Sequence, residues 1–96
     1  MRSGRPVSTP HLKVYERRSR AHEYVRFGFI VSKAVGNAVH RNLVRRRLKA
    51  ISAAYLSRLK PGTDIVIRAL PGSAQLDWDI LMAEITGVLD KGMARA

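Results

Sequence analysis

The chain has 96 residues, enough for one domain with a single modest core, and we expect that domain to span residues 1–96. Its 18 Lys and Arg against 7 Asp and Glu give a formal net charge of +11, which favours a polyanionic partner, either a nucleic acid or an anionic membrane surface. The lack of cysteine excludes disulfides and thiolate zinc sites, and the lack of a long apolar stretch or an apolar signal segment predicts a cytoplasmic protein with no membrane partner.

The first predicted strand is amphipathic. Residues 1–6 are expected to be irregular because glycine and proline interrupt them, and a short strand is possible around Val7. Residues 11–16 alternate between apolar and polar side chains, as expected for a half-buried strand. The alternation places Leu12 and Val14 on one face and Lys13 and Tyr15 on the other.

A second strand follows a basic loop predicted at residues 17–22. Residues 24–32 are rich in β-branched and aromatic side chains, so they form the strongest strand prediction in the chain. Its residues Phe27, Phe29 and Val31 share one face. Gly28 lies on the other face, where a glycine allows the close approach of another backbone.

Residues 33–37 predict a turn into a long helix. Asn37 is a suitable N-cap, the helix is predicted from Ala38 to about Leu59, and Pro61-Gly62 ends it. Along this helix an apolar stripe is expected to face the core, formed by Val44, Leu48, Ile51 and Tyr55.

The last third of the chain predicts one more strand and one more helix. Residues 64–69 form a short apolar strand of the type that is buried on both faces. A helix over residues 77–91, capped by Asp77 or Ser73, carries an apolar stripe of Trp78, Leu81, Ile85, Val88 and Leu89. The order strand, strand, helix, strand, helix allows a parallel strand pair joined by a helical crossover, which is ordinarily right-handed.

The long helix also carries a row of polar and basic residues beside its apolar stripe. This row contains Arg41, Asn42, Arg45, Lys49 and Ser52, with Arg46 at its edge. A solvated face that keeps the protein soluble is the simpler explanation. However, no acidic residue lies between Glu23 and Asp64, so the cations repel one another without local partners. A phosphate backbone would relieve this repulsion, and the pattern therefore favours RNA or DNA binding.

Three consecutive segments carry a family signature. Arg26–Lys33 reads Arg-Phe-Gly-Phe-Ile-Val-Ser-Lys, residues 34–40 read Ala-Val-Gly-Asn-Ala-Val-His, and Arg41–Leu48 reads Arg-Asn-Leu-Val-Arg-Arg-Arg-Leu. Together they resemble the signature of the bacterial ribonuclease P protein family. Weaker resemblance covers Gly4–Tyr15 and Gly62–Ala69.

The resemblance implies a fold and a function. The fold is an α+β, two-layer α/β sandwich in β-β-α-β-α order with a left-handed βαβ crossover, like a domain of a small-subunit ribosomal protein. The function is that of the protein subunit of ribonuclease P, which binds the catalytic RNA and the single-stranded 5′ leader of precursor tRNA. The RNA subunit performs the catalysis and holds Mg²⁺, whose affinity the protein raises, while the protein itself binds no cofactor tightly.

The resemblance also implies site residues. Residues that contact the catalytic RNA are Lys33, Arg41, Asn42, Arg45, Arg46 and Lys49. Tyr15, with Lys13 beside it, belongs to the leader-binding cleft, where aromatic stacking tolerates many base sequences. Two departures stand out. Leu43 occupies a position where the family usually has Arg. The family's N-terminal helix has no counterpart before Pro6, which predicts an uncovered apolar patch and, as a result, either lower stability or a homodimer that covers the patch.

No catalytic or metal site is predicted. His11, His22 and His40 lack metal-ligand spacing, and Asp77 and Asp79 are explained by helix capping. Three classes of function stay open: a ribonuclease P subunit, a structural RNA-binding protein of ribosomal type, and a DNA-binding module. The last is the weakest, because the sequence has no helix–turn–helix pairing.

Overall fold

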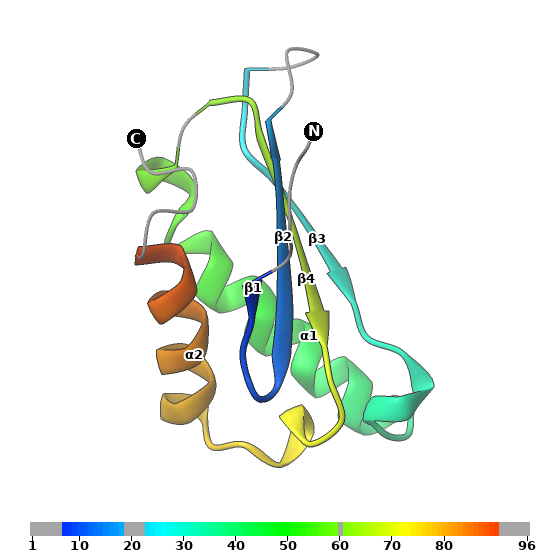
Figure 1. The fold of residues 1–96 in the computed structure, drawn as a ribbon. Helices are drawn as coiled ribbons and strands as arrows, with labels where there is room; N and C mark the ends of the chain where they lie inside the picture. The colour runs from blue at the N-terminus through cyan, green and yellow to red at the C-terminus, as the bar shows by residue number, and fades with distance from the viewer. Residues whose placement is uncertain (1–6, 19–22, 60, 91–96) are drawn as a thin grey trace.

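The computed structural model describes residues 7–18, 23–59 and 61–90, which form two layers (Figure 1). One layer is a sheet of β1 (Val7–Ser8), β2 (Leu12–Arg18), β3 (Arg26–Ile30) and β4 (Thr63–Ala69), in the order β1-β2-β4-β3. The other layer contains α1 (Ala38–Ala53) and α2 (Trp78–Asp90). The described elements include the predicted series of strand, strand, helix, strand and helix, preceded by the short strand β1. The predicted irregular segment 1–6, residues 19–22 of the predicted basic loop and the predicted helix end at Lys91 lie outside the described residues.

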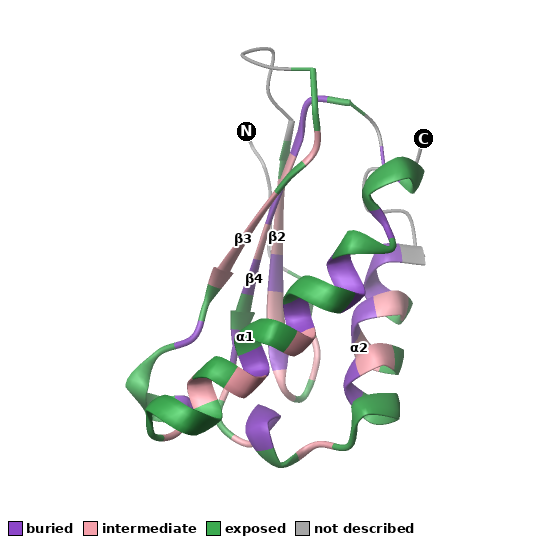
Figure 2. Cartoon of the chain, turned by 180° about the vertical axis from the view of Figure 1, so that it is seen from behind, coloured by how far each residue is buried: buried purple, intermediate pink, exposed green. Residues whose placement is uncertain are grey.

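The sheet is mixed, and its crossover has an unusual hand. β2 pairs antiparallel with β1 and β4, while β3 and β4 are parallel neighbours joined through α1. In Figure 2, α1 lies in front of the sheet, both strands point downward, and the carboxyl end of β4 lies to the right of that of β3. The β3–α1–β4 connection is therefore left-handed, against the strong general preference for right-handed crossovers.

The core lies between the sheet and the two helices. From the sheet, Leu12, Val14, Ile65 and Ile67 point into it and are at most 1% exposed. The stripes predicted on the two helices are buried as expected: Val44, Leu48, Ile51 and Tyr55 on and just after α1, and Leu81, Ile85, Val88 and Leu89 on α2. The prediction that Trp78 is a core residue is wrong. It is 37% exposed because it occupies the first turn of α2, before the first buried residue of that helix.

The first helix is shorter than predicted. α1 ends at Ala53, and the following backbone N–H groups of Ala54 and Tyr55 donate to carbonyls three residues back, which tightens the chain into a 3-10 turn over Leu56–Arg58. This turn directs Leu59 into the core. Gly62, with φ of +80°, then reverses the chain into β4.

Two further predictions about the strands are corrected. Arg17 was expected in a loop, but β2 continues through it because each residue of β2 has a partner on β4, up to Thr63. β4 was expected to be buried on both faces, yet only its helix side is covered. On the other side Asp64 and Val66 are half-buried and Arg68 is exposed. One face of the sheet is therefore accessible in the described part of the chain.

A polar contact attaches the start of β2 to α2. The backbone N–H of His11 donates to Oε1 of Glu84 at 3.2 Å, and Nδ1 of the same histidine lies 2.8 Å from Oε2. Burial opposes ionisation of Glu84, but hydrogen bonds from Thr9 and His11 outweigh it, so the pKa of Glu84 is lowered. The ionised carboxylate therefore stabilises the fold.

Glu84→Gln is expected to lower the free energy of unfolding at pH 7 by about 1 kcal/mol, the usual contribution of such hydrogen bonds. Because the folded pKa of Glu84 is lowered, its contribution is fully present above the unfolded pKa of about 4.3 and is lost as pH falls through the folded value. Urea unfolding of the wild type and of the Glu84→Gln variant between pH 7 and pH 3 measures how the difference in stability depends on pH. A stability difference that stays constant over that range would contradict the assignment.

Candidate nucleic-acid interface

The exposed side of α1 carries four polar residues that form one continuous surface. We call Asn42, Arg45, Arg46 and Lys49 the basic arc, and all four are exposed. The exposed part of α1 is on the side turned away from the sheet (Figure 2). Nη1 of Arg45 donates to Oδ1 of Asn42 at 3.3 Å, which orients the guanidinium along the helix. Within the described part of the chain no carboxylate is hydrogen-bonded to the three cations of the arc, which suits them to phosphate oxygens, to which Arg and Lys donate charge-assisted bonds.

The helix is positioned by its N-terminal cap. Oδ1 of Asn37 accepts a hydrogen bond from the backbone N–H of His40 at 3.0 Å, as predicted for an N-cap. Gly36 precedes it with φ of +155°, and a Cβ there would lie 3.0 Å from Cβ of His40. The sharp turn from β3 into α1 thus requires glycine at this position. Lys33 lies in this turn and is exposed, at the approach to the basic arc.

Two residues of the polar row predicted on α1, Arg41 and Ser52, are less accessible than expected. Arg41 is half-buried at the edge of the helix. Ser52 was expected on the polar row but is 2% exposed, because it lies next to the apolar stripe. Arg47 is half-buried, and its Nη1 donates to the backbone carbonyl of Leu76 at 2.7 Å, so it fastens α1 to the segment before α2. Leu43 is half-buried and lies outside the basic arc.

The second surface is the side of the sheet that α1 and α2 do not cover, which we call the open face. The strand register arranges its side chains in three rows across β2, β4 and β3. The rows are Lys13–Arg68–Ile30, Tyr15–Val66–Gly28 and Arg17–Asp64–Arg26. The predicted pair Tyr15 and Lys13 therefore lies on this face, in neighbouring rows.

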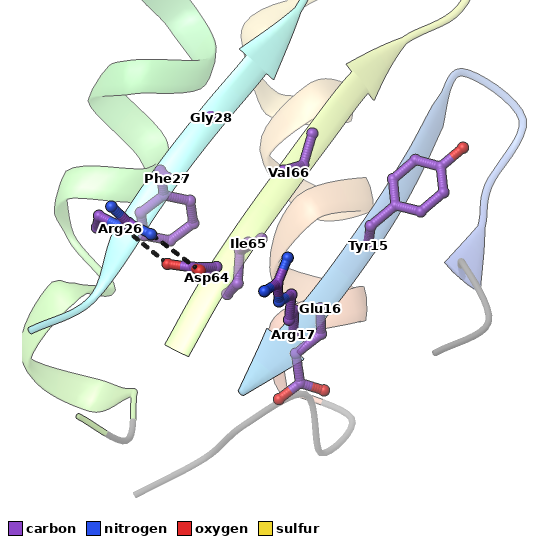
Figure 3. Close-up of a pocket in the computed structure, with 9 residues that line it drawn as sticks. All are labelled: Tyr15, Glu16, Arg17, Arg26, Phe27, Gly28, Asp64, Ile65 and Val66. Atoms are coloured by element: carbon purple, nitrogen blue, oxygen red, sulfur yellow. Dashed lines mark hydrogen bonds and ion pairs between the residues drawn. The ribbon is translucent and has the colours of Figure 1, made fainter. Parts of the chain in front are cut away.

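A shallow pocket of about 480 Å³ lies over two of these rows (Figure 3). Tyr15 borders it on β2, Val66 and Gly28 form its floor, and Arg17 and Arg26 lie at one end. Lys13 does not line it. An aromatic ring beside an apolar floor can hold an unpaired nucleobase. The cations at the end of the pocket are accompanied by two acids, Glu16 and Asp64.

The charges on the open face are unevenly compensated. Arg26 donates to both oxygens of Asp64, from Nε at 2.9 Å and from Nη2 at 3.1 Å, and these hydrogen bonds raise the pKa of Arg26 above its ordinary value. The row Lys13–Arg68–Ile30 contains two cations and no acid. Phosphate is therefore attracted more strongly to this row than to the one that contains Asp64.

Most residues of the open face were not predicted to belong to a site: Arg17, Arg26, Gly28, Asp64, Val66 and Arg68. Arg26 and Asp64 are 38 residues apart in the sequence, and only the strand register brings them together. The alternation along 64–69 was the available signal, but the segment was interpreted as buried on both faces. Among the described residues, no group of three or more His, Cys, Asp or Glu could hold a metal ion, and no helix could cross a membrane.

The comparisons with known proteins agree on one family. A family model described as Ribonuclease P matches residues 1–92. A ribonuclease P protein component from Clavibacter michiganensis is 57% identical over 68 residues, which cover 71% of this chain and 60% of that protein. Another from an Arthrobacter species is 44% identical over 95 residues, 99% of this chain and 70% of that protein.

A solved structure has the same fold. The RNase P protein of Staphylococcus aureus superposes with a TM-score of 0.87 at 24% identity, covering 97% of this chain and 84% of that one. This similarity supports the two-layer α+β architecture. The match to the Clavibacter relative spans less than two thirds of that protein's length.

Proposed function

Because the chain belongs to the ribonuclease P protein family, we propose that it is the protein subunit of a ribonuclease P and assists removal of the 5′ leader from precursor tRNA. The observation that supports this proposal is that one small domain has two separate surfaces suited to binding RNA. The basic arc on α1 suits a phosphate backbone, and the open face of the sheet suits an unpaired strand.

In this proposal the basic arc binds the catalytic RNA. Arg45, Arg46 and Lys49 donate to phosphate oxygens, and the approach of the RNA releases counterions and relieves the repulsion between the cations. Lys33 and Arg41 extend this contact toward the N-terminal end of α1. Such contacts fix the position of the protein on the RNA without selecting a sequence.

The open face binds the leader of the precursor. The leader is single-stranded, so its bases are free to lie on Tyr15 and on the floor beside it, and every base offers a flat face for such stacking. Lys13 and Arg68 hold neighbouring phosphates. This arrangement suits a subunit that acts on precursors with many different leader sequences.

The chemistry belongs to the RNA subunit in this proposal. When Mg²⁺ is bound there, it supplies charge stabilisation at the scissile phosphate. The protein's residues contribute binding energy to both RNAs and hold the substrate leader in position, in the cytoplasm where precursor tRNA is made. Part of the benefit at low Mg²⁺ comes from the protein's own positive charge, which reduces the repulsion between the two RNAs.

The test is a cleavage assay with a bacterial ribonuclease P RNA and precursor tRNA at an Mg²⁺ concentration too low for the RNA alone. Addition of the protein is expected to restore cleavage at the mature 5′ end. Bound RNA without restored cleavage would instead support the alternative, a structural RNA-binding protein of ribosomal type. The predicted homodimer stays a prediction, and a monomer in size-exclusion chromatography with light scattering would contradict it.

A further inference from the structure

The described sheet has two edge strands, and they differ in how well they are protected. β1 has only two residues, so it offers little to a further strand. β3 has five residues, Arg26–Ile30, and among the described residues it pairs with β4 alone, on one side (Figure 1). Within this part of the chain, its outer side presents backbone N–H and C=O groups without a neighbouring strand. Lysine or proline often blocks such an edge, and β3 contains neither.

The side chains at this edge are apolar and incompletely covered. Phe27 and Phe29 lie on the helix side of the sheet but are only half-buried, and their rings are nearly parallel with centroids 6.2 Å apart. Their neighbours on β4, Ile65 and Ile67, are fully buried. Ile30 is 46% exposed. The two phenylalanines therefore keep one flank open, on the side where an additional strand would lie.

The edge is also locally neutral, in contrast to the rest of this basic protein. No charged residue lies between Arg26 and Lys33, and the guanidinium of Arg26 donates to both carboxylate oxygens of Asp64. A polyanion is therefore attracted to the basic arc more strongly than to this edge. An uncharged, apolar strand is the partner that fits, and β3 of a second copy is such a strand.

A second copy fits the edge in one particular register. Two β3 strands can pair antiparallel about a two-fold axis at Gly28. Phe27 of each copy then lies opposite Phe29 of the other, and these two cross-strand aromatic pairs cover the open flanks. Ile30 lies opposite the aliphatic stem of Arg26. The two copies of Gly28 meet at the axis, where the lack of side chains allows close approach of the backbones.

We propose that β3 is a self-association edge: two copies of the chain pair antiparallel through Arg26–Ile30, centred on Gly28, and form one continuous sheet. Both basic arcs then lie on one side of the dimer and both open faces on the other. This dimer differs from the one expected from the sequence, which would cover the sheet face. Five paired residues supply about four to six backbone hydrogen bonds and bury less than the roughly 800 Å² per partner of a standard interface, so the dimer is weak.

Cysteine cross-linking tests the register, because the chain contains no cysteine of its own. The fold accommodates Gly28→Cys: Gly28 is not among the described glycines with positive φ, and a Cβ there would meet only Cγ2 of Val66, at 3.6 Å. At the two-fold axis the two Cα atoms of position 28 would be about 4.5–5.5 Å apart, within reach of a disulfide. Under mild oxidation this variant is expected to form a covalent dimer on a non-reducing gel.

Ile30→Cys is the matched control. Position 30 is more exposed than position 28, so random collision would cross-link it more readily. In the proposed register, however, the two copies of position 30 are about 14 Å apart and cannot be bridged. In sedimentation equilibrium the dimer fraction of the wild type should rise with salt, because each copy has a formal net charge of +11 and salt screens the repulsion.

Cross-linking of Ile30→Cys as readily as Gly28→Cys would overturn the proposal, as would a wild type that stays monomeric at high salt and at its highest soluble concentration. If Gly28→Cys does not fold, Ile30→Lys decides in the same sedimentation experiment: lysine opposite Arg26 should weaken the dimer roughly tenfold, from two like-charged cross-strand pairs, and an unchanged dimer would contradict the register. Hydrogen exchange of the β3 amides that is slowed by the catalytic RNA, but not by higher protein concentration, would assign the edge to RNA and also overturn the proposal.

Discussion

Alanine at both Arg45 and Lys49 is expected to weaken binding of the ribonuclease P RNA about 30-fold, from the loss of roughly 1 kcal/mol at each of two phosphate contacts. Both side chains are exposed in the basic arc. Their removal therefore leaves the core intact. The slope of log affinity against log salt concentration should become shallower by roughly 2, one for each lost phosphate contact. Filter binding or fluorescence anisotropy over a series of salt concentrations measures both quantities.

The matched control removes the same charge from the other surface. Lys13→Ala with Arg68→Ala takes two cations from the open face, where they lie directly opposite each other on β2 and β4. This variant should bind the RNA subunit nearly as well as the wild type, but should lose affinity for the leader. Equal loss of RNA-subunit binding in both double variants would mean that net charge alone matters, and would contradict a localised basic arc. Arg47 is unsuitable as a control because its side chain donates a hydrogen bond to the backbone carbonyl of Leu76, so its removal would also disturb the fold.

Tyr15→Ala is expected to reduce the affinity of the holoenzyme for leader-bearing precursor tRNA by roughly 5- to 150-fold, because a base–aromatic stack contributes about 1–3 kcal/mol. Tyr15 is half-buried on the open face and borders the pocket. Tyr15→Phe should retain most of the affinity, since stacking needs the ring and not the hydroxyl group. Equilibrium binding of precursors with and without a leader separates this effect from contacts to the tRNA body.

The leaderless substrate provides the internal control for Tyr15. Its affinity should be the same for the wild type, Tyr15→Ala and Tyr15→Phe. Circular dichroism and thermal unfolding show whether the alanine variant keeps the fold. An equal loss of affinity for both substrates would mean that Tyr15 supports the fold and does not bind the leader.

Local patterns in the sequence predicted the elements and most of the core. The alternation of Leu12 and Val14, the apolar stripe that contains Val44 and Leu48, and the cap at Asn37 are all confirmed, because each depends on residues a few positions apart. The errors occurred where a longer-range arrangement decides the outcome. Trp78 has the correct periodicity for the core of α2, but it lies at the rim, which no local pattern reveals.

The two surfaces of the candidate site also differ in how far local sequence patterns predict them. The basic arc could be predicted because all of its residues belong to one helix. The open face could not, since its rows are set by pairing between β2, β4 and β3, and Arg26 meets Asp64 only through that pairing. The left-handed crossover was expected from the family resemblance alone. General rules of chain topology favour the other hand.

The place of β4 in the sheet has a consequence for how the protein is made. β4 is the last strand among the described residues, yet it lies between β2 and β3 and joins them. While the chain emerges from the ribosome, the earlier strands have no complete sheet to enter, so α1 can form before the surface that it packs against exists. Folding must then wait for residues 63–69, and the pairing of β2 with such a distant segment makes that step slow compared with helix formation. A nascent chain released before β4 is synthesised would carry the basic helix but lack the open face of the sheet.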